Sequence, residues 1–178
     1  MNAPHKLHPQ FRAEALRIGG EKVTRDRIIE IFNPYSGDLV GTVPKASLDD
    51  VRRAFSIAKQ YRSTLTRFER ANILDKAAAL LRERTVEAAA IITMESGLCK
   101  KDAVYEIGRV ADVLGFAAGE ALKDDGQAFS CDLTPHGKKR RVVTQREPLL
   151  GAISAITPFN HPMNQVAHKV APSIATNN

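Results

Sequence analysis

An asparagine between two prolines is the residue of this chain best placed to do chemistry. Asn160 follows an apolar run, Ala152–Ile156, and lies between Pro158 and Pro162. The run predicts a buried β-strand, and the prolines fix φ and remove backbone donors, so the turn can hold the amide at the strand's carboxyl end. Ligands bind at that end of open α/β sheets. The residues alone leave a second interpretation open, in which Asn160 only satisfies backbone groups of its own turn.

The strands that must support this turn are expected near the start of the chain. Residues 1–12 are polar and carry two prolines, which indicates a mobile arm. A glycine pair at 19–20 predicts a hairpin, and β-branched residues followed by turn residues predict two more strands. The sequence therefore predicts an antiparallel β-meander, with strands over Leu16–Ile18, Lys22–Thr24, Ile28–Phe32 and Leu39–Pro44.

Helical spacing of apolar residues dominates the middle of the chain. Ser47 is a good N-cap for a first helix, whose apolar face would hold Val51, Ala54, Phe55 and Ala58. Further helices are expected over residues 67–84, from 85 to a left-handed cap at Gly97, over 101–123 and after Pro162. The inward stripe of the second helix is Ile73, Leu74, Ala77, Leu80 and Leu81, and that of the long fourth helix is Val104, Ile107, Val110, Ala111, Leu114 and Ala118.

Composition sets limits on the function. The chain has 178 residues, is 43% hydrophobic and carries a net charge of +6. The main basic cluster, residues 138–141, lies in a predicted hairpin formed by Phe129–Thr134 and Lys139–Glu147, and no aromatic interleaving or zinc-finger spacing accompanies it, so nucleic-acid binding is not expected. No apolar run reaches the length of a membrane span and no leader is evident, which indicates a cytoplasmic protein without membrane association. Cys99 and Cys131 are expected to be free thiols, and no metal site is predicted.

Several segments, in their order and spacing, resemble the aldehyde dehydrogenase family. They include Asn-Pro-Tyr-Ser-Gly at 33–37, Glu-Ser-Gly at 95–97, Glu-Pro-Leu-Leu-Gly at 147–151, Pro-Phe-Asn-His-Pro at 158–162 and Ala-Pro-Ser-Ile-Ala at 171–175. Two positions depart from the family pattern: Phe159 stands where many members have tryptophan, and Asn177 occupies the usual glycine position.

The resemblance implies an α/β fold that corresponds to the N-terminal third or so of a family member. Residues 1–127 would begin the cofactor-binding domain, 128–147 would form an antiparallel oligomerisation arm, and 148–178 would supply the first strand and helix of a Rossmann-like core. It further implies NAD or NADP as cofactor and a homo-oligomer, a dimer or a tetramer. The glycine-rich cofactor loop, the glutamate base and the catalytic cysteine would lie beyond residue 178, so neither Cys99 nor Cys131 is nominated as nucleophile.

The same resemblance assigns residues to the site. Asn160 would be the catalytic oxyanion donor, and the cofactor would contact the strand end at Ile156, Thr157, Pro158 and Phe159. Segments 95–101, 126–141 and 159–162 look like the branch of the family that acts on phosphonoacetaldehyde. A dianionic phosphonate needs a cationic pocket, for which Arg109 is the candidate, and His161 would add a second donor. For Arg109 a snorkelling surface arginine, and for His161 a simple spacer, remain open alternatives.

The function expected is therefore NAD(P)-dependent oxidation of phosphonoacetaldehyde to phosphonoacetate by the whole protein, with this segment alone inactive. Two alternatives stay open at this stage. One is a dehydrogenase of another anionic aldehyde, such as a semialdehyde, and the other is a non-catalytic assembly module.

Overall fold

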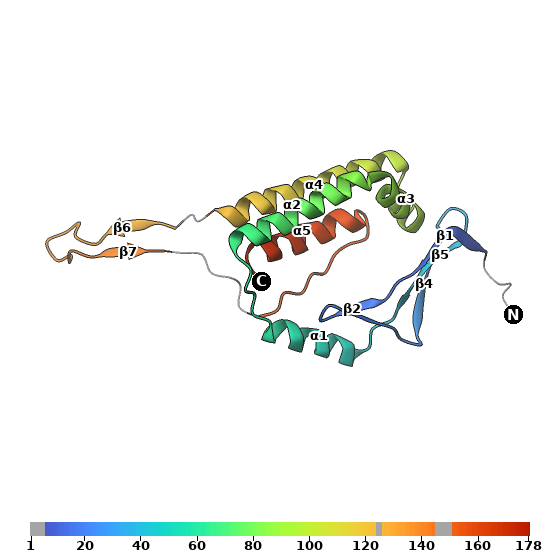
Figure 1. The fold of residues 1–178 in the computed structure, drawn as a ribbon, viewed down its shortest axis with the longest axis horizontal. Coiled ribbons are helices and arrows are strands. Elements are labelled where there is room, and N and C mark those ends of the chain that lie inside the picture. Colours follow the sequence, from blue (N-terminus) through green and yellow to red (C-terminus); the bar gives the residue numbers. More distant parts are fainter. Residues whose placement is uncertain (1–5, 124–125, 145–150) are drawn as a thin grey trace.

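The computed structural model describes residues 6–123, 126–144 and 151–178. Figure 1 shows helices α2, α4 and α5 side by side, α1 set apart from them, and the hairpin β6–β7 projecting away from the body. The elements in chain order are β1 (Leu7–Ala13), β2 (Leu16–Ile18), β3 (Glu21–Val23), β4 (Ile28–Phe32), β5 (Leu39–Pro44), α1 (Leu48–Gln60), α2 (Arg67–Glu83), α3 (Thr85–Ser96), α4 (Lys100–Leu122), β6 (Ala128–Ser130), β7 (Arg141–Val143) and α5 (Pro162–Ala175).

The N-terminal strands form a mixed sheet and a separate hairpin. In the sheet the order is β1-β5-β4, with β1 parallel and β4 antiparallel to the central strand, while β2 and β3 pair only with each other. The expected mobile arm is wrong for Leu7–Ala13, and residues 1–5 lie outside the described residues. The simple antiparallel meander is wrong as well. Main-chain pairing onto the free edge of β5 needs no apolar side-chain pattern, and Gly41 allows the close approach, since a Cβ there would meet the Arg12 carbonyl oxygen at 2.9 Å.

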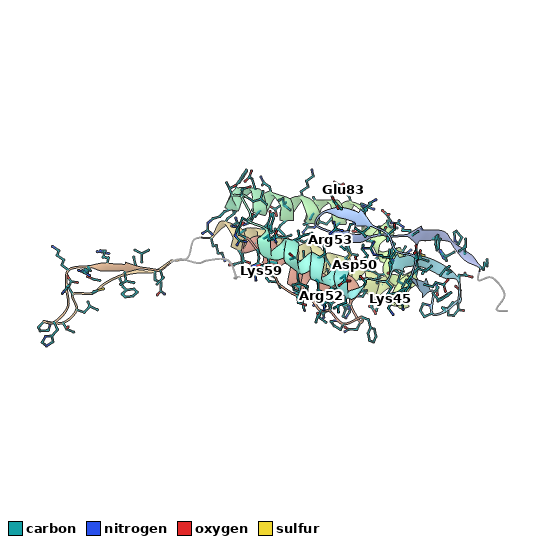
Figure 2. All side chains as sticks on the ribbon, turned by 90° about the horizontal axis from the view of Figure 1, so that it is seen from below. Lys45, Asp50, Arg52, Arg53, Lys59 and Glu83 are labelled. Carbon is teal, nitrogen blue, oxygen red and sulfur yellow. The ribbon has the colours of Figure 1, made fainter. Side chains whose placement is uncertain are left out.

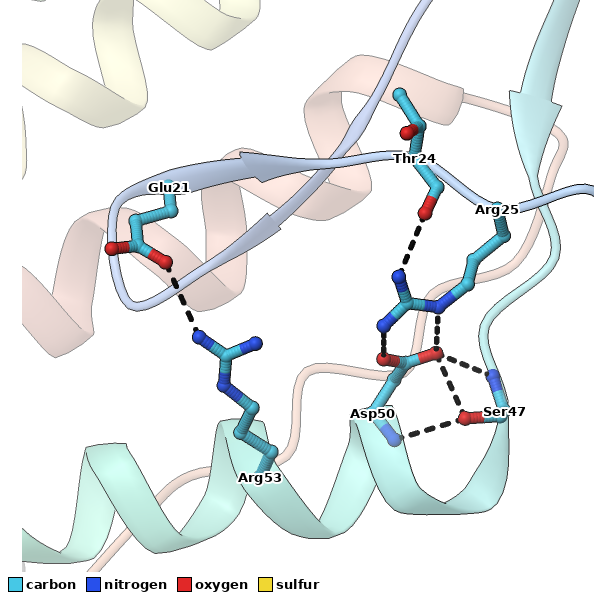
Figure 3. A network of polar contacts seen from close by, with 6 residues as sticks. All are labelled: Glu21, Thr24, Arg25, Ser47, Asp50 and Arg53. Atoms are coloured by element: carbon cyan, nitrogen blue, oxygen red, sulfur yellow. Dashed lines mark hydrogen bonds and ion pairs between the residues drawn. The ribbon is translucent and has the colours of Figure 1, made fainter.

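Ion pairs join helix α1 to residues in and next to the β2–β3 hairpin. Ser47 and Asp50 form the predicted N-terminal cap as a reciprocal capping box, and the Arg25 guanidinium forms a bidentate ion pair with the Asp50 carboxylate (Figure 3). Arg53 reaches Glu21 at 3.2 Å (Figure 3). Figure 2, a view from below, shows the labelled side chains of Arg52, Arg53 and Lys59 along helix α1.

The predicted apolar face of α1 finds no cover in the described residues. The helix is amphipathic, but Asp50 is its one buried residue, and the side chain of Phe55 is 44% exposed. The spacing predicts an apolar face and says nothing about what lies against it.

The core lies where α2 and α4 pack against each other and against α5. One cluster joins Leu74 of α2 with alanines of α4 and α5, and a second joins α3 with the first turns of α4. The predicted stripes are confirmed for Leu74, Ile107, Val110, Ala111 and Ala118, which are buried, and wrong for Ile73, Leu80 and Val104, which are exposed. Among the described helices, none combines the length and the apolar character that a membrane span requires.

The hairpin predicted near residues 128–147 forms, but its strands are short. Ala128 pairs with Val143 and Ser130 with Arg141 in an antiparallel ladder. Residues 145–147, at the end of the second predicted strand, lie outside the described residues. Both strands are largely exposed, because the described part of the chain places no third strand or helix beside them.

The buried strand predicted at Ala152–Ile156 is wrong for this chain. The segment has no assigned strand structure, and its residues are exposed apart from a half-buried Ala152. A parallel strand needs hydrogen-bonded neighbours. The described residues provide none at this place, so an apolar run alone does not form the strand.

Candidate active site

The turn that carries Asn160 is fixed by the start of α5. Pro162 is the first residue of the helix, a position where proline costs no hydrogen bond and its fixed φ suits the helix. His161 is the N-cap residue, with φ −137° and ψ 76°, and its side chain makes no cap hydrogen bond. Asn160 is exposed and forms no hydrogen bond with another described residue. Its amide is therefore not used to satisfy the backbone of its own turn.

The group that holds this helix end is Glu106 of α4, which sequence reasoning missed. Its side chain is 0% exposed, and its Oε1 accepts hydrogen bonds from the backbone N–H groups of Met163 (2.9 Å) and Asn164 (2.8 Å). These donors have no partner inside the helix, and a carboxylate beside them also opposes the positive end of the helix dipole. The signal was present in the sequence, because Glu106 shares helical register with the buried Ala103 and Val110.

His161 lies against the same carboxylate. Its Nδ1 is 3.6 Å from Oε2 of Glu106, and neither atom has a hydrogen-bond partner among the described residues. The imidazole is one-third exposed. Its two nitrogens are therefore in different surroundings: Nδ1 points toward a buried carboxylate, and Nε2 is the nitrogen left to meet a ligand.

A buried cation holds the other end of α5. Arg70 of α2 donates to the carbonyl oxygens of Ala175 (3.3 Å) and Leu65 (2.8 Å), and burial lowers the pKa of its guanidinium from the ordinary value. A positive charge is favourable at a helix C-terminus. Helix α5 thus carries an anion at its N-terminus and a cation at its C-terminus, both supplied by neighbouring helices.

The predicted cofactor contacts, Ile156 to Phe159, form an open surface leading into the turn. Ile156 is 84% exposed and Phe159 is 88% exposed, while Thr157 is half-buried. None of these residues makes a hydrogen bond with another described residue. Sequence order keeps them beside Asn160, so a ligand could touch both.

Arg109, the predicted anion receptor, is not joined to the turn by any described contact. It is exposed on α4, with its guanidinium carbon 6.0 Å from the ring centroid of Tyr105. It lies one helical turn after Glu106 and is offset from it by about 60° around the helix axis. The structure thus places Arg109 on the helix that anchors the turn, with its head group free of carboxylate partners among the described residues.

The thiols lie outside this site. Cys99 precedes α4 and is exposed, Cys131 follows β6 and is partly buried, and both are free. In the described ranges no three or more His, Cys, Asp or Glu side chains come together as a metal site would require.

Comparison with known proteins places the chain in a family. The model of the aldehyde dehydrogenase family matches residues 21–178. The chain is 35% identical over 164 residues to a lactaldehyde dehydrogenase of Methanococcus aeolicus, which covers 90% of this chain and 34% of that protein. It is 34% identical over 170 residues to a 3-sulfolactaldehyde dehydrogenase of Priestia aryabhattai, with 95% and 35% covered. The chain belongs to the aldehyde dehydrogenase family.

Solved structures show the same relationship. The NADP-dependent glyceraldehyde-3-phosphate dehydrogenase of Bacillus halodurans, solved with NADP, superposes with a TM-score of 0.86 at 36% identity and covers 95% of this chain and 36% of that one. Aldehyde dehydrogenase 21 of Physcomitrella patens, solved with succinate, superposes with a TM-score of 0.88 at 32% identity, with 93% and 35% covered. The predicted α/β fold is confirmed by these likenesses. The chain spans about a third of the length of the relatives it matches.

Proposed function

We propose that the protein of which this chain is a part oxidises an aldehyde to a carboxylate with NAD or NADP. The observation that carries the proposal is an exposed asparagine amide, free of partners among the described residues, on a turn anchored by a buried carboxylate. Family membership supplies the chemical context. In that context Asn160 donates to the oxyanion formed when a nucleophile adds to the aldehyde carbon.

The exposed segment before the turn fits a cofactor. A nicotinamide held there would supply the acceptor for the hydride that the oxidation removes from the substrate carbon. Ile156 and Phe159 offer apolar surface for a flat ring, and Thr157 adds a hydroxyl, while their backbone groups are unused within the described part of the chain. These residues would hold the cofactor close to Asn160.

Phosphonoacetaldehyde is the substrate we favour, with Arg109 and His161 as its contacts. The support is a guanidinium that has no carboxylate partner among the described residues and an imidazole next to the oxyanion donor. Relatives named for 3-sulfolactaldehyde and for glyceraldehyde 3-phosphate are consistent with an anionic aldehyde in general. A different anionic aldehyde, a semialdehyde included, is therefore the second candidate, which is also consistent with a relative named for aspartate semialdehyde.

Substitutions in the longer protein test these roles separately. Asn160→Ala should lower kcat for every aldehyde by about 10²–10³, because the oxyanion is common to all of them. Arg109→Ala should mainly raise KM for phosphonoacetaldehyde, with a loss in kcat/KM of roughly 2–4 kcal/mol, or about 30- to 1000-fold, and should affect neutral aldehydes of similar size far less. Equal losses for charged and neutral aldehydes would reject the anion pocket and leave Arg109 as a surface residue.

The isolated 178-residue chain provides a second test. It should reduce neither NAD nor NADP with any aldehyde, because neither of its cysteines lies in the site. Turnover that survives rigorous removal of host enzymes would contradict this assignment.

We also propose a cytoplasmic homo-oligomer, a dimer or a tetramer, with the β6–β7 hairpin as its contact. The support is that both strands are exposed along one projecting ribbon (Figure 1). Replacing residues 128–143 of the longer protein by a short glycine-serine linker should lower its mass in analytical ultracentrifugation. An unchanged mass would reject the hairpin as the contact.

A further inference from the structure

Glu106 stands out because a carboxylate is completely buried in a largely apolar part of the fold. Its side chain is 0% exposed, and its neighbours on the same face of α4 are Ala103, Ile107 and Val110. Burying a charge in such surroundings is costly unless hydrogen bonds replace the lost water. The buried carboxylate is therefore stable in the fold only if its partners compensate for the lost water.

The partners that compensate all belong to the start of α5. The N–H groups of Met163 and Asn164 donate to one carboxylate oxygen, and the imidazole of His161 faces the other. The N-cap residue contributes no side-chain bond of its own. Glu106, on α4, thus accepts backbone hydrogen bonds at the start of α5, as an N-cap side chain normally does at the start of its own helix.

The two carboxylate oxygens have different consequences. The bonds to Met163 and Asn164 fix the direction in which the chain enters α5, and hence the place of the preceding residue, Asn160. The contact with His161 favours a proton on Nδ1, and Nε2 is the atom presented outward. In the neutral ring Nε2 then accepts hydrogen bonds, and in the ring protonated on both nitrogens it donates, as a contact with an anionic substrate requires. No other described charged side chain on α3, α4 or α5 forms an ion pair with His161.

We propose that Glu106 is a positioning residue for the Asn160–His161 turn: it holds the turn through the backbone of α5 and fixes the orientation of the His161 ring, without touching the substrate. The catalytic part of this inference rests on the proposed function, whereas the structural part stands on the chain alone. The carboxylate also offsets the positive end of α5, which leaves an anionic substrate to be bound by side chains rather than by that helix end.

The structural part is tested on the chain of 178 residues by NMR. In the wild-type chain, the amides of Met163 and Asn164 should be protected from hydrogen exchange, and the ring nitrogen shifts of neutral His161 should report a proton on Nδ1. Glu106→Gln keeps the size of the side chain and an acceptor oxygen but removes the charge. It should move the proton of the neutral His161 ring toward Nε2, because the Gln amide group can donate to Nδ1, and it should speed exchange at both backbone amides.

Asp102→Asn is the matched control, because Asp102 is an exposed acid one turn earlier on the same helix. It should leave the tautomer of His161 and the exchange of both amides unchanged. An unprotected pair of amides in the wild-type chain, or a His161 tautomer that Glu106→Gln does not change, would overturn the anchoring. The wild-type measurement decides even if a variant fails to fold.

The catalytic part is tested in the longer protein with the same variants. Glu106→Gln should lower kcat about 10-fold or more with KM for the aldehyde within about twofold, since a displaced oxyanion donor weakens the transition state more than the bound substrate. Asp102→Asn should retain full activity. An unchanged kcat in an active protein would overturn the positioning role. Absence of aldehyde oxidation in the wild-type protein would instead reject the proposed function and leave the NMR result standing.

Discussion

Helices α1 and α5 are similar in length and in the spacing of their apolar residues, but only α5 lies in the core. They span 13 and 14 residues and both are amphipathic. Helix α5 lies in the core, where Ala171 is 0% exposed, and its two ends are held by Glu106 and Arg70. Helix α1 is held by ion pairs at its first turns (Figure 3), whereas apolar side chains such as Val51 and Phe55 remain exposed.

The difference shows that an apolar face and its burial are separate properties. The face is determined by residue spacing within the helix, and burial is determined by whether another element lies opposite. Both α2 and α4 pack against α5. Ala54 and Ala58 of α1, together with Ala152, Ile153 and Ala155 and part of α5, instead line an open cavity of about 1010 Å³.

The largest expected contrast comes from removing one large apolar side chain from each region. Leu74→Ala in α2 leaves a cavity against the alanines of α5 and should reduce the free energy of unfolding by about 2–5 kcal/mol. Phe55→Ala in α1 removes a side chain that is 44% exposed and should cost about 1 kcal/mol or less. Urea denaturation of the isolated chain measures both.

The same pair of substitutions sharpens the comparison in the longer protein. If another element covers α1 there, the cost of Phe55→Ala should rise toward that of Leu74→Ala. Equal costs in the isolated chain would contradict the separation between a buried and an open helix.

Residue patterns predicted this fold best where the evidence was local. Ser47 caps α1, Gly97 ends α3 in the left-handed conformation and Pro162 begins α5, as expected, because caps and breakers act over a few residues. The strand β1 was missed since main-chain pairing leaves no side-chain signature. The run Ala152–Ile156 failed as a strand since a parallel strand depends on neighbours distant in sequence or outside it.

The sequence likewise identified some residues of the candidate site and missed others. The turn residues were identified by their types and by resemblance, and their roles stay predictions. Glu106 and Arg70 were missed, although each interrupts an apolar stripe in register. Helical spacing of apolar residues does not reveal charged residues on the same face. Here two such charged residues, Glu106 and Arg70, hold the ends of α5.

A second, smaller contrast compares the cations that hold the two helices. Arg70→Met keeps the apolar stem but leaves the carbonyls of Ala175 and Leu65 without this donor, and should cost about 1–3 kcal/mol. Arg53→Met removes an exposed ion pair with Glu21 and should change stability little. Equal midpoints for the two variants in urea denaturation would show that burial of Arg70 does not matter.

The smallest effect concerns the acid that holds α1, and it appears in the dependence on pH. The Arg25 guanidinium, followed by the backbone and hydroxyl of Ser47, lowers the pKa of Asp50 below its ordinary value of 3.8. Because the folded pKa is the lower one, ionised Asp50 contributes stability above about pH 4, and that contribution is lost as the pH falls through the range below it.

The stability advantage of the wild-type chain over Asp50→Asn should therefore be full at pH 7 and shrink steadily below pH 4. Asp49→Asn, which removes an exposed neighbouring acid paired with Arg52, is the matched control for the loss of one negative charge. Urea midpoints at pH 7, 4 and 3 measure the difference, and an advantage that stays constant across these values would mean that the Arg25–Asp50 pair does not hold α1 in solution.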